Sequence, residues 1–155
     1  MEVHSEKEVI YRHMPIFNEA RFLIEALDSL TTQTYKNMEI LISDNASTDG
    51  TEAIVRQYAE KYPCIRYHRF EENRGAGANF RHVLGEAKGK YFMWAAGHDR
   101  WSGNFVESCV EQLERYPAAV LAFAEACWIG ADSKLFPRET GFSDTRGLDP
   151  ISRYF

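Results

Sequence analysis

The 155-residue sequence has no excess of basic charge and few cysteines. Its 18 lysine and arginine residues are outnumbered by 23 aspartate and glutamate residues, which gives a net charge of −5. General nucleic-acid binding needs clustered positive charge, so we expect no nucleic-acid partner. Cys64, Cys109 and Cys127 are an odd number at wide spacing, which fits neither a disulfide framework nor a zinc site. We expect them to be reduced core residues of a cytoplasmic protein.

Long apolar runs are also missing. No stretch approaches the roughly 20 apolar residues of a membrane span. Residues 1–8 are charged and contain no apolar segment of the secretory-signal type. With 45% hydrophobic and 26% charged residues, the composition excludes disordered and collagen-like classes. The length suits one domain with a packed core.

Hydrophobic periodicity alternates between strand and helix spacing. Apolar runs predict strands at residues 8–14, 38–43, 65–70, 91–96 and 120–127. Helical spacing predicts helices at residues 19–30, 49–62, 78–87 and 104–116. We expect Pro15 to end the first strand, Asn18 to cap the first helix, and Asp49 with Glu52 to form a capping box. The βαβαβαβαβ order predicts an α/β fold, a mostly parallel sheet with helices on both faces.

Ligands bind beyond the carboxyl ends of the strands in such sheets, so the loops after the first four strands are the candidate site. These loops read PIFNE (15–19), DNASTDGT (44–51), ENRGAGAN (72–79) and AGHDRW (96–101). Hydrogen-bonding groups, glycines and one His-Asp pair at one sheet edge predict a nucleotide pocket.

The glycines Gly75 and Gly77 are open to three interpretations. A dinucleotide-binding GxGxxG motif would need a third glycine where Phe80 stands. The two glycines would also permit a tight turn before a helix. Alternatively, the exposed amides at that helix start, together with Arg74, would hold a phosphate.

Three blocks in order resemble the opening of family 2 glycosyltransferases, which have the Rossmann-like GT-A fold. They are Pro15-x-Phe17-Asn18-Glu19, Leu27-Asp28-Ser29-Leu30 followed by Gln33-Thr34-Tyr35, and the run EILISDNASTDGT at residues 39–51. The resemblance continues through Asn73-x-Gly75-x-x-x-Asn79, Ala87-x-Gly89-x-Tyr91 and the loop that ends with Asp99 and Trp101. It extends from about Val9 to about Asp132.

The resemblance implies a nucleotide-diphosphate-sugar donor, with UDP as the expected nucleotide, and inverting transfer of the sugar to a hydroxyl of a saccharide, lipid or protein. It implies that the nucleotide site contains Pro15, Phe17, Asn18, Glu19, Asp44, Asn73, Arg74, Gly75, Asn79 and Gly97. Pro15 and Phe17 would line the nucleoside, and Asp44 would bind the base. From the residues alone, Asp44 is equally well explained as a turn residue after a strand, and Asn18 as a helix cap.

The resemblance also implies a divalent cation on the loop after the fourth strand, where the family has an Asp-x-Asp motif. A cation there offsets the charge of the leaving diphosphate. Here the loop reads Ala96-Gly97-His98-Asp99, so Ala96 and His98 replace the two acids. We expect His98 and Asp99 to hold Mn²⁺ rather than Mg²⁺, since imidazole suits transition metals. The alternative is a loop without metal affinity.

The family's catalytic base comes from the part of the domain after the metal loop, and the sequence ends at Phe155, before that part. We therefore expect a truncated nucleotide-binding half, with residues 1–132 as the domain, residues 133–155 as a connector, and no assigned catalytic residue. Apolar surface left open would favour a homo-oligomer. Two other functions remain open: a non-catalytic nucleotide-binding module, and an unrelated nucleotide-dependent α/β oxidoreductase.

Overall fold

The computed structural model describes residues 10–124 and 126–136 and divides the chain into two compact units, Met1–Glu111 and Gln112–Phe155. The first unit contains a parallel sheet in the order β3-β2-β1-β4. Its strands are β1 (Ile10–Ile16), β2 (Met38–Asp44), β3 (Ile65–Arg69) and β4 (Tyr91–Trp94). They are joined by the helices α1 (Leu23–Thr31), α2 (Thr51–Lys61) and α3 (Ala76–Gly85).

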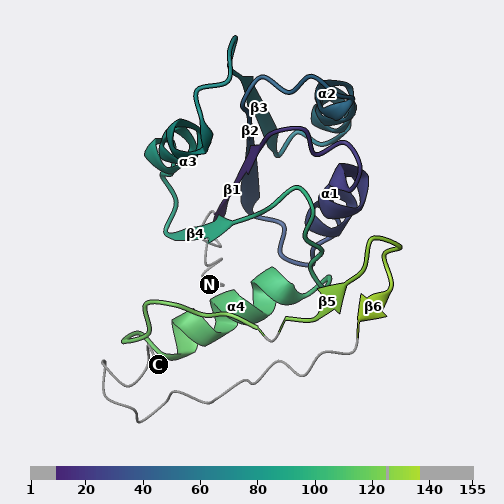
Figure 1. Ribbon diagram of the computed structural model, residues 1–155. Helices are drawn as coiled ribbons and strands as arrows, with labels where there is room; N and C mark the ends of the chain where they lie inside the picture. The colour runs from purple at the N-terminus through teal and green to yellow at the C-terminus, as the bar shows by residue number, and fades with distance from the viewer. Residues whose placement is uncertain (1–9, 125, 137–155) are drawn as a thin grey trace. The chain divides into compact units, whose positions relative to one another are not determined.

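Helices cover both faces of this sheet. Figure 1 shows α1 and α2 on one side and α3 on the other. The chain moves outward from β1 to β2 and β3, and then returns past β1 to reach β4. Because such crossovers are right-handed, a reversal of direction puts the returning helix on the opposite face. The predicted α/β fold is confirmed.

The main core lies under α1. Its apolar residues recur at helical spacing, and this buries Leu23, Ala26, Leu27 and Leu30. These four side chains belong to one buried cluster with Met14, Ile16, Ile40, Ile42, Val55, Ile65 and Ala95. The cluster fixes α1 and α2 on the sheet and thereby positions the loops that precede them.

Pro15 lies within β1, so the prediction that it ends the strand is wrong. The carbonyl of His13 accepts a hydrogen bond from the Ala95 amide (2.9 Å), so alternate residues of β1 face β4. The ladder to β4 stops at His13, whereas the ladder to β2 continues to Ile16. Pro15 therefore comes after the last residue that β4 pairs, where its missing amide is not needed.

Arg12 is fully buried in β1, which is unusual for a cation. Its Nη1 donates to the Leu30 carbonyl (3.0 Å) in the last turn of α1, where a positive charge complements the helix dipole. Within the described residues, its Nε and Nη2 have no hydrogen-bond partner. Burial lowers the pKa of Arg12 to about 10, although nearby Cys64 opposes this shift.

One predicted helix cap is wrong, and the predicted capping box is only half formed. The chain makes a turn at Glu19, whose carbonyl accepts hydrogen bonds from Phe22 and Leu23, and α1 begins only at Leu23, so Asn18 does not cap it. At α2, Asp49 Oδ1 accepts a hydrogen bond from the Thr51 amide (2.9 Å). Glu52 does not complete a reciprocal box, because its carboxylate pairs with arginines, Arg56 among them.

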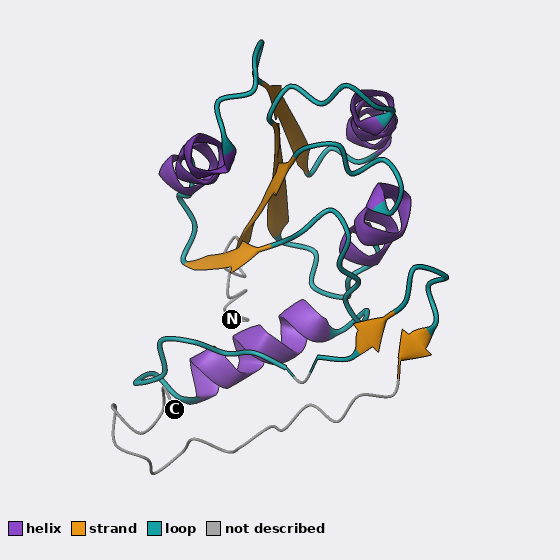
Figure 2. Cartoon of the chain, in the orientation of Figure 1, coloured by secondary structure: helices purple, strands orange, loops and turns teal. Residues whose placement is uncertain are grey.

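The predicted fifth parallel strand is also wrong. The described residues of segment 120–127 form no strand, and Val120 and Leu121 are 98% and 70% exposed. An apolar run indicates a tendency to be buried, but it does not supply a neighbouring strand. The second unit instead has two short antiparallel strands, β5 (Trp128–Ile129) and β6 (Leu135–Phe136) (Figure 2). Helix α4 (Phe105–Arg115) crosses the boundary between the units.

Other expectations are corrected in part. β4 is half-buried rather than buried on both faces, because β1 is its one neighbour among the described strands. The three cysteines are free as predicted, but Cys127 is exposed, and Cys64 and Cys109 are only half-buried. The beginning of the first predicted strand and residues 137–155 of the predicted connector lie outside the described residues.

The exposure of Leu121 gives a stability prediction. We expect Leu121→Ala to change the free energy of unfolding by less than about 0.5 kcal/mol, as for most surface substitutions. Leu27→Ala, the matched control in the core, should cost about 2–5 kcal/mol through lost burial and a cavity. Urea denaturation measures both. If Leu121→Ala lowered the free energy of unfolding as much as Leu27→Ala, Leu121 would be buried, as the predicted fifth strand requires.

Candidate nucleotide-sugar site

The strand order reverses between β1 and β4, so the crevice for a ligand lies beyond the carboxyl ends of these two strands. The loops that follow them meet there. His98 Nδ1 lies 3.1 Å from both carboxylate oxygens of Glu19. A Cβ atom at Gly97 would lie 2.9 Å from Glu19 Cγ, so the two loops pack directly against each other. The structure brings together three predicted residues, Glu19, Gly97 and His98.

The loops after β1 and β2 are joined by four hydrogen bonds. They run from Asn18 N to Ser47 Oγ (2.9 Å), Thr48 N to Asn18 Oδ1 (2.8 Å), Glu19 N to Thr51 Oγ1 (2.9 Å) and Ala20 N to Asp49 Oδ2 (3.1 Å). We call this set the loop strap. Asn18 has a φ of 56° and Ala46 a φ of 62°, so both loops contain a left-handed residue. Asn18 is therefore a connector between loops.

Asp44 is fully buried at the end of β2. Its Oδ1 accepts hydrogen bonds from the amide and hydroxyl of Ser47 (2.8 and 2.5 Å), and its Oδ2 accepts one from the Tyr67 hydroxyl (2.8 Å). Burial and the Asp44 carboxylate raise the pKa of Tyr67 far above its usual value. The turn role of Asp44 is confirmed. A carboxylate offers about four acceptor positions, and three protein donors occupy most of them in a side chain with no exposed surface.

The residues around Asp44 were missed by sequence reasoning. They are Ser47, Tyr67 and Arg69, whose Nε lies 3.6 Å from Asp44 Oδ2. Asp44 and Arg69 are the last residues of adjacent strands and are paired in register. The predicted strands end at residues 43 and 70, so aligning those ends would have paired the wrong residues, and no local signal in the sequence indicated this contact.

Asn45 connects the second and third loops and was also missed. Its Nδ2 donates to Asn73 Oδ1 (2.9 Å), and its Oδ1 accepts from the Arg74 amide (2.9 Å). Asn73, Arg74 and Gly75 are exposed. Gly75 has a φ of 79°, so the interpretation of this glycine as a turn residue before the helix is confirmed.

Asn79 is buried beneath the loops. Its Nδ2 donates to the carbonyls of Ser43 (3.0 Å) and Ile16 (3.3 Å), so it ties α3 to the ends of β2 and β1. Its Oδ1 is buried with no hydrogen-bond partner in the described part of the chain. At the surface of the same edge, Pro15 is half-buried and Phe17 is 44% exposed. The predicted residues thus divide into a buried layer and an open one.

The chemistry of the loop after β4 fits a cation that is held by few protein ligands. The carboxylate that contacts His98 belongs to Glu19, while Asp99 is exposed. Between residues 10 and 136, leaving out 125, no three His, Cys, Asp or Glu side chains cluster tightly enough to hold a metal ion. One or two protein donors suffice where diphosphate oxygens and water complete the coordination.

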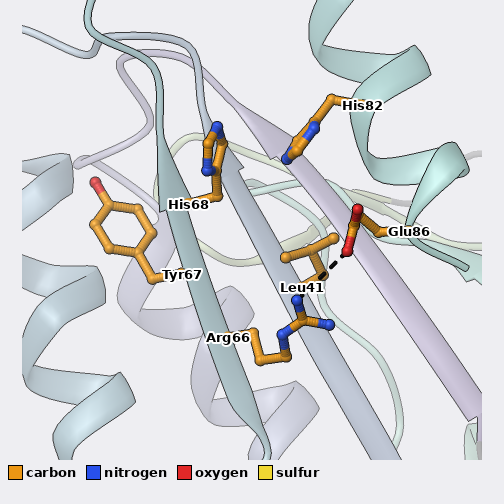
Figure 3. A pocket seen from close by; sticks show the side chains of 6 residues that line it. All are labelled: Leu41, Arg66, Tyr67, His68, His82 and Glu86. Atoms are coloured by element: carbon orange, nitrogen blue, oxygen red, sulfur yellow. Dashed lines mark hydrogen bonds and ion pairs between the residues drawn. The ribbon is translucent and has the colours of Figure 1, made fainter.

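A pocket of about 250 Å³ lies elsewhere, beside β3 (Figure 3). It is lined by Leu41, Arg66, Tyr67, His68, His82 and Glu86, none of which was predicted as a site residue. The rings of His68 and His82 face each other with centroids 4.3 Å apart. Arg66 is paired with Glu39 (2.9 Å) and Glu86 (3.4 Å), so the charges at this pocket are largely satisfied within the protein.

A parallel sheet with polar loops at its switch point is the arrangement in which open α/β proteins bind ligands. Residues 13–141 match the family described as glycosyl transferase family 2, and the chain belongs to this family. Membership in this family argues against the oxidoreductase alternative. No helix within the described ranges is long and apolar enough to cross a membrane.

Similar proteins include an uncharacterized glycosyltransferase of Rickettsia typhi, 35% identical over 66% of this chain and 31% of that protein. The putative glycosyltransferase EpsE of Bacillus subtilis is 36% identical over 66% of this chain and 37% of that protein. Mannosyltransferase PcManGT from Pyrobaculum calidifontis, solved with GDP-Man and Mn²⁺, matches with a TM-score of 0.64 and 27% identity over 70% of this chain and 33% of that one. S. aureus TarS 1–349 shares the fold (TM-score 0.65, 22% identity, 70% of this chain and 33% of that one). The GT-A fold is confirmed, and the chain spans about a third of these proteins.

The His68 side chain gives a pH prediction. Burial lowers its pKa below 6.5, with help from His82 and Arg74 and against Glu86. Between the folded and unfolded pKa values the unfolded chain binds more protons, so stability falls as the pH drops below 6.5. We expect His68→Gln to reduce the loss of unfolding free energy between about pH 7.5 and about pH 5.5 in urea titrations. A residual loss is expected from His13, whose pKa is also lowered by burial. An equal loss in variant and wild type would contradict the prediction.

Proposed function

We propose that the chain binds the nucleoside diphosphate of a nucleotide sugar, with UDP as the expected nucleotide, at the carboxyl ends of β1, β2 and β4. The whole protein would transfer the sugar, with inversion, to an acceptor hydroxyl. The observation that carries the proposal is the meeting of three loops at the switch point. The loop strap joins the loops after β1 and β2, and the contact of Glu19 with His98 joins the loops after β1 and β4.

The open residues of this edge have suitable chemistry for each part of the nucleotide. Pro15 and the exposed ring of Phe17 would pack against the nucleoside. Below them lies the fully buried Asp44, whose carboxylate would accept a hydrogen bond from the base. Arg74 and the amide-bearing turn at Gly75 would border the ribose and phosphates, together with Asn73.

Other residues of the set would act through the loops that they hold. Asn79 attaches the start of α3 to β1 and β2, and Asn18 joins the first two loops. Gly97 leaves room for the Glu19 side chain. Their contribution to nucleotide binding would be indirect, through the shape of the edge.

A divalent cation would be held by His98 and Asp99, with Mn²⁺ preferred over Mg²⁺ because imidazole suits transition metals. When bound, the cation supplies positive charge for the leaving diphosphate. The Mn²⁺ in the similar mannosyltransferase supports the presence of a divalent cation. The three free cysteines support a cytoplasmic location, and the exposed Phe80, Leu84 and Trp94 support self-association.

The proposal is tested by thermal shift with UDP, GDP and ADP, each with Mn²⁺, Mg²⁺ or a chelator. A ligand that binds only the folded chain raises its melting temperature. We expect UDP with Mn²⁺ to give the largest shift. A larger shift with GDP would change the assigned base, and no shift with any nucleoside diphosphate would reject the proposed site.

The role of Asp44 is tested separately with Asp44→Asn, which keeps the shape of the side chain. If the carboxylate accepts a hydrogen bond from the base, the free energy of UDP binding measured by calorimetry should become less favourable by about 1–3 kcal/mol. Asp28→Asn is the matched control, because Asp28 also accepts a hydrogen bond from a tyrosine (Tyr58, 2.6 Å) but lies on α1 away from the loops. Equal affinity in the two variants would remove Asp44 from the base site.

A further inference from the structure

We infer that Glu19 is a positioning residue for His98. In this arrangement the Glu19 carboxylate keeps the imidazole proton on Nδ1 and leaves the Nε2 lone pair free for the divalent cation. The inference rests on the proposed nucleotide-sugar function and assigns the metal contact to one atom of one side chain.

The geometry of the pair determines which nitrogen carries the proton. His98 Nδ1 lies 3.1 Å from both Oε1 and Oε2 of Glu19. A carboxylate only accepts hydrogen bonds, so Nδ1 must be the donor. In a neutral imidazole the other nitrogen, Nε2, is then unprotonated and able to bind a metal. A carboxylate that orients a metal-binding histidine in this way is a common second contact in metal sites.

The Glu19 backbone is held firmly enough to do this. Its amide donates to Thr51 Oγ1 (2.9 Å), and its carbonyl accepts hydrogen bonds from Phe22 (3.2 Å) and Leu23 (3.1 Å). The side chain lies against the backbone at Gly97, where a Cβ atom would come within 2.9 Å of Cγ and 3.0 Å of Cβ. The Glu19 side chain therefore packs against the loop after β4, with its carboxylate beside His98.

The two side chains differ in exposure as this role requires. The Glu19 side chain is 22% exposed, and the His98 side chain is 57% exposed. The orienting group is thus shielded, while the imidazole reaches solvent at the switch point. Diphosphate oxygens and water would complete the shell of a cation bound there.

The first test is the tautomer of His98 in the 155-residue chain without metal or nucleotide, read from two-bond ¹H–¹⁵N spectra at about pH 8.5, where an ordinary imidazole is neutral. We expect the proton on Nδ1 in the wild type. Glu19→Ala should move it to Nε2, the usual preference in water. Glu19→Gln, which keeps an acceptor oxygen, should retain it on Nδ1.

The second test is Mn²⁺ affinity, measured from free Mn²⁺ by electron paramagnetic resonance in the presence of saturating UDP. Loss of an orienting carboxylate typically weakens metal binding by about 10–100-fold, and we expect this for Glu19→Ala. Gly97→Ala should give a similar loss by displacing the Glu19 side chain. The matched control is Glu25→Ala. This substitution breaks the ion pair between Glu25 of α1 and Arg100 (3.2 Å), which lies on the same loop as His98. It should leave affinity unchanged, and melting temperatures should confirm that all variants fold.

Several outcomes overturn the inference, and they differ from failure of the proposed function. A wild-type proton on Nε2, or equal Mn²⁺ affinity in Glu19→Ala and Glu25→Ala, rejects the role of Glu19 alone. Equal UDP affinity with Mn²⁺ and with chelator also rejects the inferred role of Glu19, but it does not contradict the proposed nucleotide site. No binding of any nucleoside diphosphate rejects the proposed function, and the inference fails with it.

Discussion

The register of β1 against β2 is the constraint on which the edge of the sheet depends. The ladder pairs Ile16 with Asp44, so the loops after the two strands start at the same level. Their polar groups can therefore satisfy one another, and the loop strap is the result. A register slip of one residue would turn the side chains to the opposite faces of the sheet and separate these partners. The buried apolar face of both strands keeps that slip from occurring.

The order of strands and helices was predictable because periodicity is a local property of the sequence. Leu23, Ala26, Leu27 and Leu30 show their helix without reference to the rest of the chain. A strand also needs a neighbour, which local pattern does not reveal. Val120 and Leu121 therefore looked like strand residues and are exposed. The helix start was missed for a related reason: Asn18 has capping chemistry, but its side chain is taken by the Thr48 amide across the fold.

The position of the proposed site residues at one edge of the sheet was predictable, but their contacts were not. The motif that carried the resemblance contains Asp44 and Asn79, and family membership is confirmed. Both side chains are buried and serve the fold. Asn79 reaches the carbonyls of Ile16 and Ser43, which lie 63 and 36 residues away in the chain. Hydrogen bonds over such separations follow from topology, and single-residue chemistry does not show them.

The carboxyl edge of the sheet therefore has two layers of residues with different roles. In the lower layer, Asp44 and Asn79 hold strands, loops and α3 together, and replacing them leaves buried partners unsatisfied. In the upper layer, Phe17, Arg74 and His98 are exposed and available to a ligand. In the proposed nucleotide site, a lower-layer substitution would change stability and ligand affinity together, whereas an upper-layer substitution would change affinity with little cost to the fold. Chemical specificity would thus be free to vary in the upper layer while the lower layer preserves the shape of the edge.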